Sequence, residues 1–235
     1  MTTGRLEAFS DGVIAIILTI MVLEMTPPKG DGFRELLPLL PVFLSYVQTF
    51  VYVGIYWNNH HHMLHACNAV TGGILWANLH LLFWLSLFPL TTAWMGENHF
   101  TAAHTAFYAR VLLMAAIAYY ILQQTIIRSQ GQGSILKEAI GRDWKGKLSP
   151  VLYSVAVLAT LLSSWIGQAI LVIAALMSFI PDTRIEKRLA MQNGLPSAAG
   201  ASRGYTTRIL ERTANRICIS VEKMLETRLR RTALK

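Results

Sequence analysis

The chain has 235 residues, of which 53% are hydrophobic and only 14% are charged. A soluble domain of this length has too little interior to bury so much apolar surface, so the composition excludes an ordinary soluble fold and indicates a membrane protein. The net charge of +8 is concentrated after Pro181, where twelve Lys and Arg stand against five acids. In a membrane protein this pattern indicates a cytoplasmic segment near anionic lipid, and we expect no nucleic-acid partner.

The first two predicted spans occupy residues 6–25 and 36–57. A helix of roughly 20 apolar residues crosses a bilayer. The first segment ends before Pro27 and Pro28. It holds an acid near each end and is followed by no small-residue cleavage site, so we expect an uncleaved span rather than a signal peptide. The second precedes the polar run 58–62.

The remaining apolar segments predict four more spans. The third covers residues 69–94 with Pro89 near its end, and the fourth covers 101–127. From 148 to 180 the chain is apolar for too long a stretch to be one helix, and polar residues interrupt it at 163–167. We therefore predict two short helices in a hairpin. The fold class is an all-α integral membrane bundle of six transmembrane helices per subunit.

The distribution of basic residues predicts the topology. The loop between spans four and five is basic, whereas the two cations in the loop after span one are balanced by two acids. By the positive-inside rule, we expect a multi-pass protein of the cell membrane with both termini cytoplasmic. The basic residues of the inner loop are Arg128, Lys137, Arg142, Lys145 and Lys147.

Composition divides the chain into three parts. Residues 1–188 form the six-span domain, and 189–204, rich in Gly, Ser and Ala, form a flexible linker. Residues 205–235 form a basic cytoplasmic helix whose apolar residues recur near heptad spacing. Two interpretations of this helix stay open: it lies on the anionic inner leaflet, or it forms a short coiled coil.

One face of the first span carries a narrow stripe of aliphatic and small residues. At about 100° per residue, four positions lie within about 60° of Ile16. These are Gly12, Thr19, Ile20 and Leu23. Asp11 points away from the stripe, and a charge at the edge of a span needs a partner, for which Arg5 is a candidate. On spacing alone, the stripe either lines a central axis or contacts lipid and neighbouring helices.

Histidines gather at the end of the second span, at positions 60, 61, 62 and 65. Imidazoles bind zinc, but no carboxylate or cysteine accompanies them within this segment, so we predict no metal site. We expect His60 or His61 to form a hydrogen bond inside the subunit instead. The candidate partners are Ser10, Asp11 and Asn78.

Several motifs resemble those of the transmembrane protein 175 family of potassium channels. The first span opens with Arg-x-x-x-Phe-Ser-Asp-Gly at residues 5–12, and Tyr56-Trp57-x-x-His60-His61 closes the second. Further matches are Trp76-x-Asn78, Ser86-x-x-Pro89 and a Pro-Asp-x-Arg-Ile ending at 181–185. The resemblance covers about residues 4–188.

The resemblance implies a homotetramer in which span one of each subunit lines a central pore for K⁺, with no cofactor and no selectivity-filter loop. Carried over by position, Ile16 forms the narrowest ring, Ile20 and Leu23 form further apolar rings, and Thr19 supplies a hydroxyl for selectivity. The other matched residues are assigned to a structural network. These are Arg5, Phe9, Ser10, Asp11, Gly12, Trp57, His60, His61 and Asn78.

Two other classes of protein fit the sequence less well than a channel. A secondary transporter of a cation or small solute needs broken helices and a polar pocket at the midplane, and span one has no Gly or Pro in its middle. A membrane enzyme finds support only in the histidines, without a nucleophile and base pair beside them. We therefore predict a potassium-selective channel with passive conduction, and no enzyme.

Overall fold

The computed structural model describes residues 2–29, 32–131 and 144–179. All of them belong to the first of two units into which the chain divides, residues 1–182 and 183–235. The described part forms helices and contains no strand, which confirms the all-α prediction. The predicted linker and basic helix, the 181–185 motif and most of the basic loop lie outside the described residues.

The first two spans are long helices. Helix α1, Thr3–Leu23, has 21 residues and is about 31 Å long, enough to cross a hydrocarbon core of about 30 Å. It ends ahead of Pro27. A 3₁₀ helix, η1 at Phe33–Leu39, then leads into α2, Leu40–His65. Helix α2 continues eight residues beyond the predicted end at Trp57, because the polar residues there are stabilised by contacts with α1 rather than by lipid.

The third predicted span is broken into two helices. Helix α3, Gly72–Ser86, is capped by the preceding Thr71, whose hydroxyl oxygen accepts a hydrogen bond from a backbone N–H of the first turn at 3.4 Å. Helix α4, Phe88–Glu97, follows directly after Leu87. The break has a covalent cause, since Pro89 lacks an N–H and its ring disfavours a continuous helix.

The second half of the described chain contains one long helix and a helical hairpin. Helix α5, Ala102–Gln130, has 29 residues. Helices α7, Trp144–Ala159, and α8, Ser164–Phe179, have 16 residues each and are joined by a turn at 160–163. The predicted hairpin of short helices is therefore confirmed. Within the part of the chain that the structure describes, four segments are long and apolar enough to span a membrane, and this hairpin adds two shorter apolar helices.

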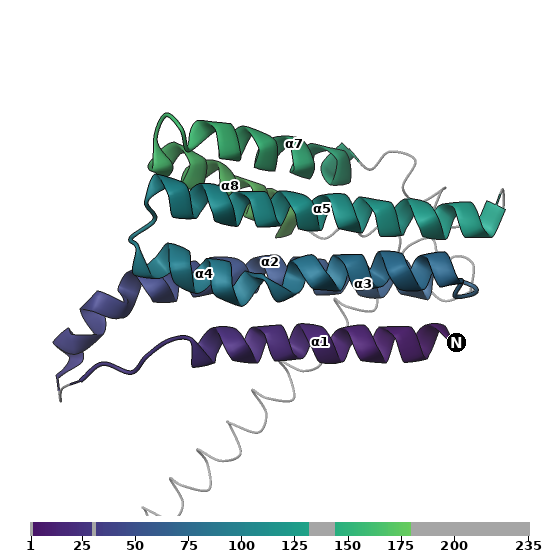
Figure 1. Ribbon diagram of the computed structural model, residues 1–235, viewed down its shortest axis with the longest axis horizontal. Helices are drawn as coiled ribbons and strands as arrows, with labels where there is room; N and C mark the ends of the chain where they lie inside the picture. Colours follow the sequence, from purple (N-terminus) through teal and green to yellow (C-terminus); the bar gives the residue numbers. More distant parts are fainter. Residues whose placement is uncertain (1, 30–31, 132–143, 180–235) are drawn as a thin grey trace, which may run out of the picture. The chain divides into compact units, whose positions relative to one another are not determined.

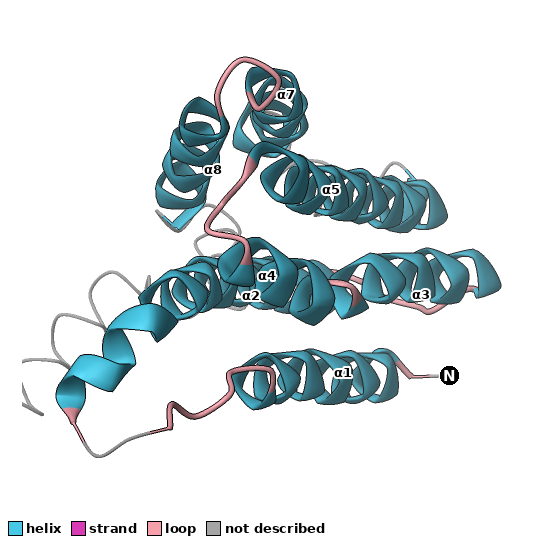
Figure 2. Ribbon diagram, turned by 60° about the vertical axis from the view of Figure 1, so that its left-hand side comes forward, coloured by secondary structure: helices cyan, strands magenta, loops and turns pink. Residues whose placement is uncertain are grey.

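The helices pack so that α1 lies at one edge. Helix α5 packs against α3, α4 and α7, and α7 packs against α8, whereas α1 contacts α2, α3 and α4. Both views show α1 beneath the layer of α2, α3 and α4, with α5, α7 and α8 on the far side of that layer (Figures 1 and 2). One side of α1 therefore has no helix of the described residues against it.

Polar contacts inside the bundle fix the position of α2. The Thr49 hydroxyl lies 2.8 Å from the hydroxyl of Thr92 on α4 and 3.0 Å from that of Tyr108 on α5. The Tyr52 hydroxyl donates to the carbonyl of Leu171 on α8 at 2.6 Å. These hydroxyls are satisfied within the protein, as an apolar environment requires.

Candidate functional site: the first helix and its polar anchor

Helix α1 has one buried and one exposed face. The buried residues are Leu6, Ser10, Ile14, Ile17 and Met21. On the opposite face, Ile16 is 58% exposed, Ile20 is 38% exposed and Leu23 is 80% exposed. Gly12 and Thr19 are exposed beside them. The five residues of the predicted stripe thus share the face that the subunit leaves uncovered, because α2, α3 and α4 all pack on the other side.

The hydroxyl of Thr19 is oriented by its own helix. It donates to the backbone carbonyl of Ile16 at 2.9 Å. Donation uses the single hydroxyl proton and leaves the lone pairs of the oxygen available on the exposed side. Thr19 can therefore offer an oxygen ligand to a cation without giving up a hydrogen bond.

A chain of hydrogen bonds joins α1, α2 and α3 behind this face. The Nε2 atom of His60 lies 2.7 Å from Oδ1 of Asn78, and Nδ2 of Asn78 donates to Oγ of Ser10 at 2.9 Å. Ser10 in turn donates to the carbonyl of Leu6 at 2.9 Å. Since Oδ1 of Asn78 can only accept, Nε2 of His60 must carry a proton. All three side chains are buried, with at most 1% of their surface exposed.

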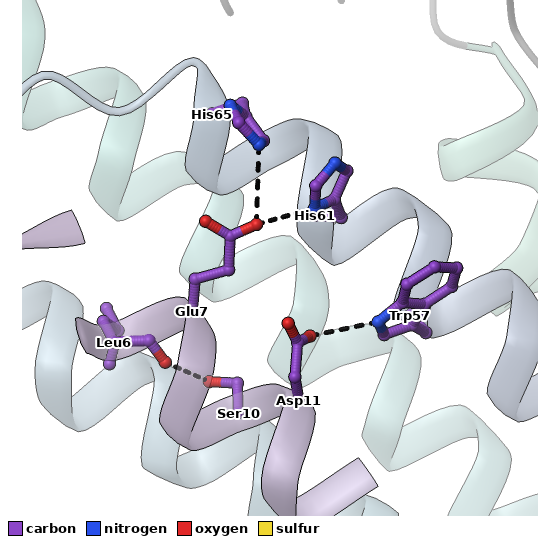
Figure 3. Close-up of polar contacts among 7 residues, drawn as sticks. All are labelled: Leu6, Glu7, Ser10, Asp11, Trp57, His61 and His65. Atoms are coloured by element: carbon purple, nitrogen blue, oxygen red, sulfur yellow. Dashed lines mark hydrogen bonds and ion pairs between the residues drawn. The ribbon is translucent and has the colours of Figure 1, made fainter. Parts of the chain in front are cut away.

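Asp11 belongs to a second contact between α1 and α2. Its Oδ1 accepts a hydrogen bond from Nε1 of Trp57 at 3.0 Å (Figure 3). The Trp57 ring lies against His61 in a stacked arrangement, with centroids 6.1 Å apart. The expected direction of Asp11, away from the aliphatic stripe and toward a neighbouring helix, agrees with this contact. Its partner is an indole of α2 rather than the proposed Arg5.

One turn earlier, Glu7 contacts two histidines of α2. Its Oε1 lies 2.6 Å from Nδ1 of His61 and 3.5 Å from Nε2 of His65. Figure 3 shows the carboxylate of Glu7 pointing toward both rings. Glu7, Ser10 and Asp11 are spaced at i, i+3 and i+4, so one face of α1 holds every polar anchor described above. Together these contacts fix the rotation of α1 and turn Ile16 outward.

The sequence-predicted network residues divide into two groups. The structure brings together Ser10, Asp11, Trp57, His60, His61 and Asn78. Arg5, Phe9 and Gly12 lie on the exposed side of α1, and none of the three joins this network among the residues that the structure describes. Glu7 was missed, although the helical spacing that grouped the stripe also places Glu7 beside Asp11.

The fold and this site define a class of protein. The chain is a multi-pass α-helical membrane protein in which a long first helix is anchored through polar contacts on one face and leaves an apolar face uncovered.

Comparison with known proteins identifies the family. Residues 5–89 match the family model described as "Endosomal/lysosomal potassium channel TMEM175". A potassium channel of Chryseobacterium sp. (strain P1-3) is 52% identical over 189 residues, which cover 80% of this chain and 98% of that protein. A potassium channel of Chamaesiphon minutus is 30% identical over 186 residues, 74% of this chain and 92% of that protein. The chain belongs to the TMEM175 family, as the resemblance predicted.

A solved structure shares the fold. The crystal structure of a lysosomal potassium-selective channel TMEM175 homolog from Chamaesiphon minutus superposes with a TM-score of 0.65 at 26% identity. The match covers 75% of this chain and 95% of that one.

Proposed function

We propose that this chain is one subunit of a homotetrameric, potassium-selective channel that conducts passively, with α1 lining a central pore. The relatives named as potassium channels support the activity. The role of α1 rests on its uncovered apolar face. Because α1 contacts the subunit only through the opposite face, this apolar face must meet either neighbouring subunits around a pore or lipid. No cofactor enters this proposal, and K⁺ is the permeant ion.

The proposed constriction consists of rings of Ile16, Ile20 and Leu23. A cation passing an apolar ring loses part of its hydration shell and gains no ligand in return. Such rings therefore limit the conductance and make it sensitive to the size and polarity of these side chains. Thr19, placed between them, offers oxygen lone pairs, and we assign it to the preference for K⁺.

Small residues on the same face support the close approach of neighbouring subunits. A Cβ atom at Gly12 would meet nothing within 4 Å, so the packing of the subunit itself does not require a glycine there. Small residues at helix contacts within membranes let backbones approach closely. We therefore infer that Gly12 lies where copies of α1 converge.

The proposed orientation has both termini on the cytoplasmic side of the cell membrane. The excess of Lys and Arg in the loop between spans four and five and after Pro181 supports it. In this orientation the basic end of the chain lies near the anionic inner leaflet, which attracts it electrostatically.

Flux through reconstituted liposomes tests the activity. Purified protein is placed in vesicles loaded with K⁺, and efflux is followed with external Na⁺ or an impermeant cation, against empty vesicles as control. We expect rapid K⁺ efflux down its gradient and much slower Na⁺ flux. Protein-containing vesicles no more permeable than empty ones would contradict the proposal.

A secondary transporter remains the second candidate, because the break between α3 and α4 at Leu87 is the kind of interrupted helix that transporters use. The two functions differ in the same assay. A channel conducts K⁺ alone, whereas a transporter needs a coupled ion or solute. Efflux that depends on a second ion would favour the transporter.

A further inference from the structure

The contact of Glu7 with two histidines forms a cluster of metal-ligating side chains that the proposed pore does not use. The Glu7 carboxylate comes from the first turns of α1, and His61 and His65 come from the last turns of α2. One ligand atom from each residue lies within 4.8 Å of the other two. Figure 3 shows Glu7 reaching toward both rings from the facing helix.

The donor set selects a class of ion. Two imidazoles with one carboxylate suit zinc and similar divalent transition metals, whereas Mg²⁺ and Ca²⁺ prefer sites built of oxygen. The two histidines are four residues apart, so they project from the same face of α2, the spacing with which one helix offers two ligands to one ion. Their ring centroids are 4.4 Å apart.

Two of the three distances between ligand atoms lie within about 0.7 Å of those in a tetrahedral site, and the two imidazole nitrogens lie within 4.8 Å of each other. With metal–ligand distances of about 2.0–2.1 Å, the atoms of a tetrahedral site lie roughly 3.3 Å apart. The distance from Glu7 to Nε2 of His65 is 3.5 Å, close to this value. The 2.6 Å contact with Nδ1 of His61 has to open by several tenths of an ångström, because the ion lies between the two ligand atoms.

The surroundings of the cluster leave it accessible and partly preorganised. The side chain of His65 is 54% exposed and that of His61 is 37% exposed, so an ion can enter from solution. The ring of Trp57 lies beside that of His61, with an angle of 25° between the two planes. Glu7 is held between helices and is only 19% exposed. Three protein ligands leave a fourth position for water.

We propose that Glu7, His61 and His65 form a binding site for a divalent transition-metal ion of the zinc class, which ties the start of α1 to the end of α2. This proposal departs from the prediction of no metal site, which rested on the absence of a carboxylate within the histidine segment itself. The carboxylate comes from another helix. Binding does not depend on the proposed channel function.

Cobalt(II) is a suitable probe because its visible absorption reports tetrahedral coordination by nitrogen and oxygen. Full-length protein is purified in detergent, freed of any histidine tag and treated with chelator before titration with Co²⁺. We expect one ion per chain, displaced by Zn²⁺. His65→Ala should weaken binding by at least about a hundredfold, since losing even an outer-shell partner costs about 10–100-fold. Glu7→Gln should act in the same direction.

His104→Ala is the matched control, because His104 lies near the start of α5, at the opposite end of the bundle from the start of α1 (Figure 1). It should bind Co²⁺ as the parent does. Gel filtration checks that each variant is folded. His65 is the most exposed of the three ligands, so His65→Ala should disturb folding least. As a second measurement, Zn²⁺ should raise the unfolding midpoint of the parent and leave that of His65→Ala unchanged. Absence of tetrahedral Co²⁺ in the parent, or equal binding by parent and His65→Ala, would overturn the proposal.

Discussion

Replacing Ile16 with Asn tests the proposed pore most directly. Ile16 is 58% exposed within the subunit, and the buried face of α1 lies on the other side of the helix. The substitution therefore removes little packing inside the subunit, and its effect on folding should stay within about 0.5 kcal/mol, as for other surface positions. In a pore, the new amide lies where a passing cation has lost hydration.

The expected effect on conduction follows from the barrier at this ring. An amide oxygen from each subunit replaces part of the hydration that an aliphatic ring withholds. If the barrier falls by about 1.4 kcal/mol, the rate of permeation rises roughly tenfold. A change of this size is resolved by single-channel recording or by liposome flux normalised to the amount of folded tetramer.

The neighbouring residue provides a matched control. Ile17 is only 3% exposed and packs inside the subunit. Asn at this position buries an amide without a partner and removes apolar contacts, which should cost about 2–4 kcal/mol of folding free energy. Ile17→Asn should lower the yield of folded protein and leave the conductance of surviving channels unchanged.

Unaltered single-channel current from folded Ile16→Asn tetramers would refute the reasoning. A lipid-facing position predicts the opposite pattern, in which the polar side chain lowers stability in the membrane and the permeation rate per channel stays constant. Such a result would move α1 away from the pore axis.

The other predictions concern the same helix and its anchor. Thr19→Val keeps the shape of the side chain and removes the hydroxyl. The ratio of K⁺ to Na⁺ permeability, measured under bi-ionic conditions, should therefore fall more than the conductance does. An unchanged ratio would show that Thr19 does not contribute to selectivity. Asp11→Ala removes the hydrogen bond to the indole of α2, which is worth about 1 kcal/mol. The thermal stability of the tetramer should fall while the preference for K⁺ persists. Stable tetramers that pass Na⁺ as readily as K⁺ would contradict this. Asn78→Leu leaves the buried N–H of His60 without its acceptor. The unfolding midpoint should therefore drop by the equivalent of about 1–2 kcal/mol. A midpoint equal to that of the parent would show that the hydrogen-bond chain between the three helices contributes nothing to stability.

Local sequence information was sufficient to predict that the apolar segments are helical and which residues share the exposed face of α1. Apolar length located the spans, and a polar interruption in a long apolar run predicted the hairpin of α7 and α8. Helical periodicity grouped Gly12, Ile16 and Thr19 on one face, because the angle between residues is a fixed property of the helix.

Element ends were less predictable. The polar residues after Trp57 suggested the end of an apolar span, yet α2 continues to His65. The length of an apolar run indicates how many residues can lie in the lipid. The end of the helix depends instead on the contacts that its last turns make. Here those turns contact Glu7 of α1, 54 residues before His61 in the chain. The third span was predicted as one segment, yet Pro89 divides it into two helices at Leu87.

The sequence by itself determined the membrane class, the helical fold and the family, because composition, periodicity and short motifs are properties of the chain read locally. Only the tertiary structure decided which polar groups meet. It joined His60 to Asn78 and Ser10, paired Asp11 with Trp57, and placed a carboxylate of α1 between two histidines of α2. Ligands and hydrogen-bond partners are selected by distance in space, and residues far apart in sequence come within about 3 Å only when helices pack in one particular register.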